Sequence, residues 1–362
     1  MEKILRAAIE RGASDLHIKA GDVFRARING ELVPMTKQLL TPEQTREVAM
    51  RLIPNERDRN NIDRITDYDC AWGVPGLGRF RVNILRQRGS FMIVLRIIPV
   101  EIPNFEQLGL PGQLGEIAEL PRGLILVTGV TGSGKTTTQA AIIGHINQTF
   151  RKHIITLENP IEYLHRDINC SITQREIGSD TSSFQTGLRA ALREDPDVIL
   201  IGEMRDTETM DTAIKATETG HLVISTLHTP DAATTISRMI SVFPPEEQEM
   251  LRVRLAEALA SVVSQRLLPR LDGQGRILAC ELLRKTGAIR DCILDPQRID
   301  EIRYLMEEGK NYGMQTFDQH LRDLVQAELV DYEVAKQAAT NPTDFELKMK
   351  TLGEDQLIEG MM

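Results

Sequence analysis

The chain has 362 residues, which is long for one hydrophobic core and predicts two or three domains. Its 41% hydrophobic and 26% charged residues are typical of a soluble globular protein, and its net charge of −9 argues against a stable nucleic-acid partner. The four cysteines form no CxxC pair, so no zinc site or redox pair is indicated. No signal peptide or membrane-spanning apolar run is recognisable, so we expect a cytoplasmic protein without direct membrane insertion.

The first part of the chain mixes helix and strand patterns. Residues 2–11 place apolar side chains on one helical face, and residues 41–53 begin with a helix-start signal. The stretches between and after these helices alternate apolar and polar positions, as short strands do. Residues 1–98 are therefore predicted to form a small α+β domain. A linker rich in Pro and Gly, without sustained periodicity, follows over residues 99–112.

The second part, residues 113–285, alternates apolar strands with amphipathic helices. This order predicts a parallel sheet covered by helices on both faces, an α/β core. A hairpin is expected around Asp272–Gly273, and residues 286–362 read as a C-terminal helical region. The predicted core strands are 123–129, 153–158, 197–203 and 221–228.

The stretch Gly129–Thr136, GVTGSGKT, follows the first of these strands and precedes a helix. It fits the phosphate-loop pattern, in which glycines bring backbone N–H groups close to phosphate oxygens. Lys135 is expected to reach the β- and γ-phosphates of ATP, and the Thr136 hydroxyl to ligate Mg²⁺. A plain glycine-rich turn is the alternative, but strand, loop and helix occur in the required order. The predicted nucleotide-binding residues are Gly129, Val130, Thr131, Gly132, Ser133, Gly134, Lys135, Thr136 and Thr137.

Acidic residues flank the apolar run at 198–201. Glu203 follows it, where a parallel sheet presents its ligand-binding edge, and Asp197 precedes it. The pattern resembles a Walker B strand, so Asp197 and Glu203 are expected to hold Mg²⁺ directly or through water. The alternative is a solvated glutamate at the end of a strand.

Two further strand ends carry candidate catalytic residues. Glu158 and Glu162 are separated by a turn containing Pro160, so both are candidates to orient or deprotonate the attacking water. Glu162 is the preferred base, and the alternative is that this segment is only a polar loop. His228 ends the strand at 221–228 and is expected to contact the γ-phosphate, although a lone histidine there is often structural.

Six segments together resemble the secretion-type hexameric ATPase family, and within it the pilus-retraction branch. They are SDLHI (14–18), GRFRVN (78–83), GVTGSGKTTT, TLENPIEY, DPDVILIGEMRD and GHLVISTLHT. The resemblance covers roughly residues 1–290. It implies a RecA-like core with a PAS-like N-terminal domain, a homohexamer, and ATP bound between the N-terminal domain of one subunit and the core of its neighbour. It also implies that Arg81 and Arg96 act in trans as arginine fingers. The alternative is that they are ordinary strand-face charges.

The same resemblance implies pilus retraction, docking on a platform protein at the inner membrane, and possible pairing with a second pilus ATPase. The chain departs from the family pattern at Asn159, Asp291 and Cys292, and residues 313–321 also resemble accessory retraction ATPases. Three alternatives therefore stay open. They are an accessory retraction ATPase, an ATPase of pilus extension or type II secretion, and a nucleotide-gated scaffold without turnover.

Overall fold

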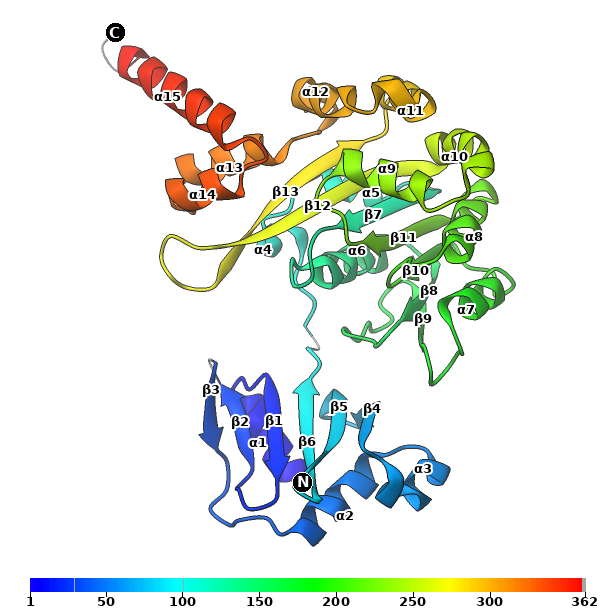
Figure 1. Ribbon diagram of the computed structural model, residues 1–362, viewed down its shortest axis with the longest axis vertical. Helices are drawn as coiled ribbons and strands as arrows, with labels where there is room; N and C mark the ends of the chain where they lie inside the picture. Colours follow the sequence, from blue (N-terminus) through cyan, green and yellow to red (C-terminus); the bar gives the residue numbers. More distant parts are fainter. Residues whose placement is uncertain (29, 100, 360–362) are drawn as a thin grey trace. The chain divides into compact units, whose positions relative to one another are not determined.

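A computed structural model of the chain describes residues 1–28, 30–99 and 101–359; Val100 of the predicted linker and residues 360–362 of the C-terminal region lie outside this range. The chain divides into two compact units (Figure 1). The first comprises residues 1–101 with the short segment 162–164, and the second comprises residues 102–161 and 165–362. Each unit has its own sheet and its own hydrophobic core.

The first unit is built on a six-stranded antiparallel sheet with the strand order β3-β2-β1-β6-β5-β4. This agrees with the predicted N-terminal α+β domain. Its strands are β1 Asp15–Lys19, β2 Arg25–Ile28, β3 Glu31–Pro34, β4 Asp67–Val74, β5 Gly78–Gln87 and β6 Ser90–Ile97. Its helical segments are α1 Glu2–Glu10, α2 Pro42–Leu52, α3 Glu56–Asn60 and the 3-10 turn η1 Ile62–Arg64.

One face of this sheet forms the core of the unit. Leu16 on β1, Val82 on β5 and Leu95 on β6 are fully buried and pack with the apolar faces of α1 and α2. Alternation along each strand sends the neighbouring residues to the opposite face, and there Arg81 and Arg96 are exposed. The period of two in the sequence therefore separates a buried apolar face from a polar face that carries the two arginines.

The second unit is built on a seven-stranded sheet with the order β13-β12-β7-β11-β10-β8-β9. The strands from β12 to β9 pair in parallel, and β13 pairs antiparallel with β12. Every residue of β7, β10 and β11 is buried, which explains their predominantly apolar sequences. The strands are β7 Gly123–Thr128, β8 His153–Glu158, β9 Ser171–Glu176, β10 Val198–Ile201, β11 Leu222–Leu227, β12 Leu259–Pro269 and β13 Arg276–Arg284.

Helices cover both faces of this sheet, which gives the predicted α/β core. On one face lie α4 Phe105–Leu108, α5 Gln113–Ala118 and α6 Lys135–Thr149. On the other lie α7 Phe184–Ala191, α8 Thr207–Glu218, α9 Ala232–Ser241, α10 Pro245–Ala258, α11 Gly287–Leu294 and α12 Glu301–Glu308. Helix α4 falls within the predicted linker, where a capping box between Asn104 and Gln107 starts a single helical turn that no periodicity revealed.

The C-terminal region is helical, as predicted. Helices α13 (Phe317–Gln326) and α14 (Tyr332–Ala338) lie beside the β12–β13 hairpin, and α15 (Pro342–Glu359) leads to the C-terminus (Figure 1). They pack on the hairpin through a separate apolar cluster that includes Leu268, Ala279 and Phe317. The remaining segments are the 3-10 turns η2 Pro296–Arg298 and η3 Gly309–Tyr312. None of the helices in the described part of the chain combines the length and apolar content needed to cross a bilayer.

Candidate nucleotide-binding and hydrolysis site

The phosphate loop joins the end of β7 to the start of α6. Gly129 follows β7 with a φ of 141°, and Gly134 precedes α6 with a φ of 92°, a conformation that favours glycine. A Cβ atom at Gly129 would lie 2.5 Å from the Gln265 carbonyl oxygen and 2.6 Å from the Ser133 hydroxyl. Gly129 therefore has no room for a side chain, and β12 and the loop itself fix the path of the backbone toward α6.

Lys135, the first residue of α6, folds back onto the loop. Its ammonium donates hydrogen bonds to the carbonyl oxygens of Gly129 at 2.8 Å and Val130 at 3.0 Å. Burial lowers the pKa of Lys135, and the Glu203 carboxylate opposes this shift. Among the described residues the buried Ser133 hydroxyl has no hydrogen-bond partner. A desolvated cation, a spare hydroxyl and the N-terminus of a 15-residue helix together suit a phosphate group.

Glu203 lies just beyond the carboxyl end of β10, on the same edge of the sheet as the phosphate loop. Its carboxylate is 2.8 Å from Nε of Arg205 and 3.7 Å from Nε2 of His228, and 18% of its side chain is exposed. The backbone before it is held on both sides, because Gly202 donates to the Leu157 carbonyl at 2.8 Å and accepts from the Thr226 hydroxyl at 2.7 Å. The structure therefore brings Glu203 and His228 together, and adds Arg205, which sequence reasoning had not singled out.

Glu158 ends the neighbouring strand β8 and is buried. Its Oε1 accepts from the Thr156 hydroxyl at 2.6 Å and from the Gln174 side-chain amide at 3.1 Å. Gln174 comes from β9, an edge strand whose mostly polar sequence had not indicated a strand. Because β7, β11, β10 and β8 are successive parallel strands, the loop, His228, Glu203 and Glu158 share one edge of the sheet.

Asp197 does not join this group. It precedes β10, and its carboxylate accepts a hydrogen bond from the backbone N–H of His153 at 2.8 Å, at the amino end of β8. Six positions of extended chain separate it from Glu203, about 20 Å. The expectation that Asp197 holds Mg²⁺ fails because a strand delivers the residues at its two ends to opposite edges of the sheet. The hydrogen bond between Asp197 and His153 instead joins the amino ends of β10 and β8.

Glu162, the preferred base, follows the turn after β8 and is exposed. It is grouped with the first unit, whereas Glu158 and Glu203 belong to the second. The geometry of the second unit therefore describes Glu158 and Glu203 only, and the choice of base among the three carboxylates stays a prediction.

The second unit also contains side-chain oxygens that are suited to bind the expected Mg²⁺. Within the described residues no group of three or more His, Cys, Asp or Glu side chains is arranged to hold a metal ion. A magnesium ion that arrives with ATP needs only one or two protein oxygens, because phosphates and water supply the rest. Thr136, half-buried on the first turn of α6, and Glu203, close enough to influence the Lys135 ammonium, match this requirement.

A groove continues from the phosphate loop and was not foreseen from the sequence. Its volume is about 540 Å³, in the range of ligand pockets. Gly134, Thr137 and Thr138 line it on the side of the loop and α6. The opposite wall comes from the β12–β13 hairpin, with apolar Leu267, Ile277 and Leu278 and the cationic side chains Arg270 and Arg276. Residues 106–109 of α4 and its end, which include the Glu106 carboxylate, also line the groove. A partly apolar groove of this size beside a phosphate loop suits the base and ribose of a nucleotide.

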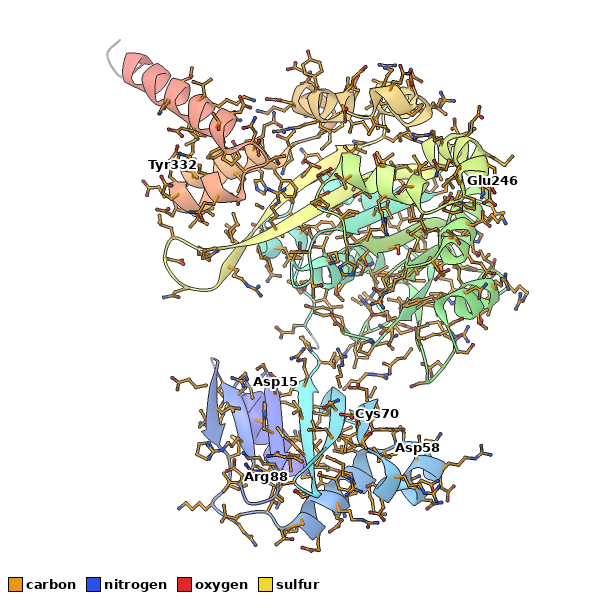
Figure 2. The ribbon with its side chains drawn as sticks, viewed as in Figure 1. Asp15, Asp58, Cys70, Arg88, Glu246 and Tyr332 are labelled. Atoms are coloured by element: carbon orange, nitrogen blue, oxygen red, sulfur yellow. The ribbon has the colours of Figure 1, made fainter. Side chains whose placement is uncertain are left out.

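Arg81 and Arg96 lie directly opposite each other on the antiparallel strands β5 and β6 of the first unit. Two cations at this spacing repel, and Asp15 on β1, labelled in Figure 2, lies opposite Arg96 on its other side. Nε of Arg96 is 3.0 Å from the Asp15 carboxylate. Within the described residues the Arg81 side chain makes no hydrogen bond or ion pair, and it is exposed. Arg81 is thus the arginine of this pair available to a ligand or another subunit.

Comparison with known proteins agrees with this geometry. The type IV pilus retraction ATPase PilT of Pseudomonas aeruginosa is 41% identical over 343 residues, which cover 95% of this chain and 99% of that protein. The type IV pilus ATPase PilU of the same organism is 41% identical over 349 residues, or 96% of this chain and 91% of PilU. The crystal structure of the pilus retraction motor PilT with bound ADP superposes with a TM-score of 0.88 at 44% identity, covering 95% of this chain and 98% of that one.

The match extends beyond single motifs. Residues 1–353 fit the model of the family described as Type II/IV secretion system protein, so both units and most of the C-terminal helices are included. The phosphate loop and the residues at the carboxyl ends of β8, β10 and β11 lie inside this range. The chain therefore belongs to the Type II/IV secretion system protein family, the group that the six sequence segments had indicated.

Proposed function

We propose that this chain is an ATP-hydrolysing motor that works as a homohexamer and powers type IV pilus retraction. The observation that carries the proposal is the phosphate loop, with Glu203 and His228 3.7 Å apart at the ends of neighbouring strands beside it. Its 41% identity to PilT over nearly the whole of both chains, and its structural similarity to the pilus retraction motor PilT with bound ADP, support it further.

In this proposal each group at the sheet edge has a separate task. The Lys135 ammonium leaves the loop carbonyls for the β- and γ-phosphates, and the groove beside α6 takes the nucleoside. Thr136 and Glu203 would hold Mg²⁺, and the bound ion would neutralise negative charge on the phosphates. Glu158, Glu162 and Glu203 are the candidates to orient and deprotonate the attacking water. His228 donates a hydrogen bond to the γ-phosphate, and its contact with Glu203 aligns it.

The arginines of the first unit complete the site in trans. Charge that develops on the γ-phosphoryl group needs cations, and Lys135 supplies one. Arg81 is exposed and has a neighbouring cation, Arg96, that is itself balanced by Asp15. We therefore assign Arg81 as the finger that acts on the ATP of an adjacent subunit, and Arg96, held by Asp15, as the neighbouring residue that helps to orient it. Hydrolysis then requires the oligomer, and opening and closing of the subunits provides mechanical work.

The partners follow from the same proposal. A retraction motor docks from the cytoplasm on a platform protein of the inner membrane that carries the pilus. The 41% identity to PilU supports a second arrangement, in which this chain is the accessory ATPase and acts beside a partner pilus ATPase. The scaffold alternative is opposed by Glu158, Glu203 and His228, which lie at the edge of the sheet where ATP would bind.

Two variants test the enzymatic part. Lys135→Ala should lose both ATP binding and turnover. Glu203→Gln should keep ATP affinity within a few fold and lose turnover by at least about a hundredfold, because it acts on water and metal rather than on the ground state. Binding is measured by titration calorimetry and turnover by phosphate release. ATP binding without any turnover in the wild-type hexamer, at every protein concentration, would favour the scaffold instead.

The direction of the motor is tested in the organism that carries the chain. Deletion of its gene should leave pili on the cell surface while abolishing twitching motility, because extension continues without disassembly. A cell without surface pili would assign the chain to extension. Normal twitching under low load, with loss only under high load, would favour the accessory role.

A further inference from the structure

Glu281 lies in the middle of β13, and its side chain is only 5% exposed. Its Oε1 accepts a hydrogen bond of 2.8 Å from the backbone N–H of Ala232, the first residue of α9. Sequence reasoning had not singled out this residue, because only the pairing of β12 with β13 brings it beneath α9. The structure therefore joins the edge strand β13 of the second unit to the beginning of the helix that follows His228.

The electrostatic surroundings of Glu281 are unusual for a carboxylate. Burial raises its pKa to about 7, and the Asp231 carboxylate at the start of α9 adds to the shift. Arg266 of β12 and Arg303 of α12 oppose it, but within the described residues neither forms an ion pair with Glu281. Both have partners elsewhere: Arg303 is 2.6 Å from Asp318, and Arg266 lies over the Phe317 ring. The main stabilising contact of the Glu281 charge is thus the hydrogen bond from the Ala232 N–H at the start of α9, and it offsets the effect of burial only in part.

The first turn of α9 is tied closely to His228. Ala232 is four positions after His228 in the sequence, a span of at most about 14 Å. Within it, the buried Thr229 hydroxyl lies 2.6 Å from the Thr235 hydroxyl, which is also 2.6 Å from the Asp231 carbonyl oxygen. These bonds make the segment from His228 to the first turn of α9 one local unit. A contact that holds Ala232 therefore also restricts where the His228 imidazole can lie.

We propose that Glu281 is a positioning residue of the hydrolysis site: its carboxylate holds the first turn of α9, and through that turn it holds His228 against Glu203 and the γ-phosphate. The inference rests on the proposed function for its catalytic consequence only. A neutral glutamine of the same shape would occupy the site without a buried charge. An ionised carboxylate is a stronger hydrogen-bond acceptor for the N-terminus of a helix than an amide is. The buried charge of Glu281 therefore holds α9 in position, but it lowers the stability of the folded chain.

The kinetic test uses Glu281→Gln and Asp231→Asn in the full-length chain. In the wild type, kcat should fall as pH drops below about 7, because protonation of Glu281 loosens α9. Glu281→Gln should have about tenfold lower kcat at pH 8, with KM for ATP within about twofold of the wild type. It should also lack the fall in kcat below about pH 7, which we call the acidic limb of the pH profile. Asp231→Asn removes a like charge, so the pKa of Glu281 falls and the limb moves to lower pH. A limb that persists in Glu281→Gln arises from another group and would overturn the proposal.

Two comparisons separate positioning from general loosening. Adding Glu281→Gln to His228→Gln should cause no further loss of kcat, because Glu281 acts through His228. Asp331→Asn makes the same acid-to-amide change at the N-terminus of α14, where Asp331 accepts from Glu333 N–H at 2.9 Å, and should leave kcat and the limb unchanged. Additive losses in the double variant would assign Glu281 a structural role alone.

A third readout requires no turnover, so it distinguishes failure of this inference from failure of the proposed function. Amide hydrogen exchange, corrected for intrinsic rates, should be at least about threefold faster in the peptide covering residues 229–240 of Glu281→Gln than in the wild type at pH 8. Exchange in α8 should not change. Unchanged exchange in α9 would overturn the inference even in an active enzyme, whereas faster exchange in an inactive protein would leave it standing and refute only the ATPase.

Discussion

Glu281→Gln should stabilise the second unit, and the gain should grow with pH. Burial raises the pKa of Glu281 from 4.5 to about 7, a difference that corresponds to about 3 kcal/mol between the two protonation states. Between these values the folded chain binds more protons than the unfolded one at this position. Its contribution to stability therefore falls as pH rises from about 4.5 through 7. Glutamine carries no charge, so the free energy of unfolding of Glu281→Gln does not decrease with pH at this position.

The assay is a double difference, which cancels any change in the hydrogen bond to Ala232 that is the same at both pH values. The free energy of unfolding of Glu281→Gln minus that of the wild type is measured at pH 5 and at pH 8, and should be larger at pH 8 by up to about 3 kcal/mol. Far-UV circular dichroism is needed, because the single tryptophan, Trp72, lies in the first unit.

The control variant is Glu246→Gln on α10, an exposed position labelled in Figure 2, for which the double difference should stay below about 0.5 kcal/mol. The same small value for Glu281→Gln would refute the reasoning, since it would mean that no charge is buried at β13. Stability gained together with lost turnover would indicate that the site keeps this charge for function.

Three further predictions concern the other parts of the molecule. Gly129→Ala should weaken ATP binding at least tenfold by calorimetry, because its Cβ would lie 2.5 Å from a β12 carbonyl oxygen, and retained affinity would contradict the packing described. Phe80→Ala should destabilise the first unit by about 4 kcal/mol, reported by fluorescence of Trp72, whose ring centroid lies 5.7 Å from that of Phe80. Arg81→Ala subunits and Lys135→Ala subunits, each inactive alone, should regain partial turnover when mixed, and no recovery would remove Arg81 from the neighbour's site.

The parts of the site that the sequence predicted are those that local chemistry determines. The phosphate loop needs its glycines, lysine and threonine in one continuous segment, and Glu203 and His228 end apolar strands. Because parallel strands present their carboxyl ends at one edge, the motif order alone was enough to bring these residues together.

The parts that the sequence did not predict depend on pairing between distant segments. Asp197 was misassigned because two acidic residues around one apolar run look equivalent in sequence, although they lie at opposite edges of the sheet. Glu281 and the groove beside α6 depend on how the β12–β13 hairpin packs against α9 and α6, which the turn signal at Asp272–Gly273 does not encode. Strand β9 was missed because its polar, half-exposed residues carry no apolar run.

The central claim is a composite ATPase whose site is completed by a neighbouring subunit. Its most direct test is the rate of ATP hydrolysis per subunit against protein concentration, with the size of the assembly determined in parallel, for the wild type and Glu203→Gln. We predict turnover that appears only as hexamers form, and that disappears in Glu203→Gln while ATP still binds. Equal turnover per subunit in monomers and hexamers would contradict the claim.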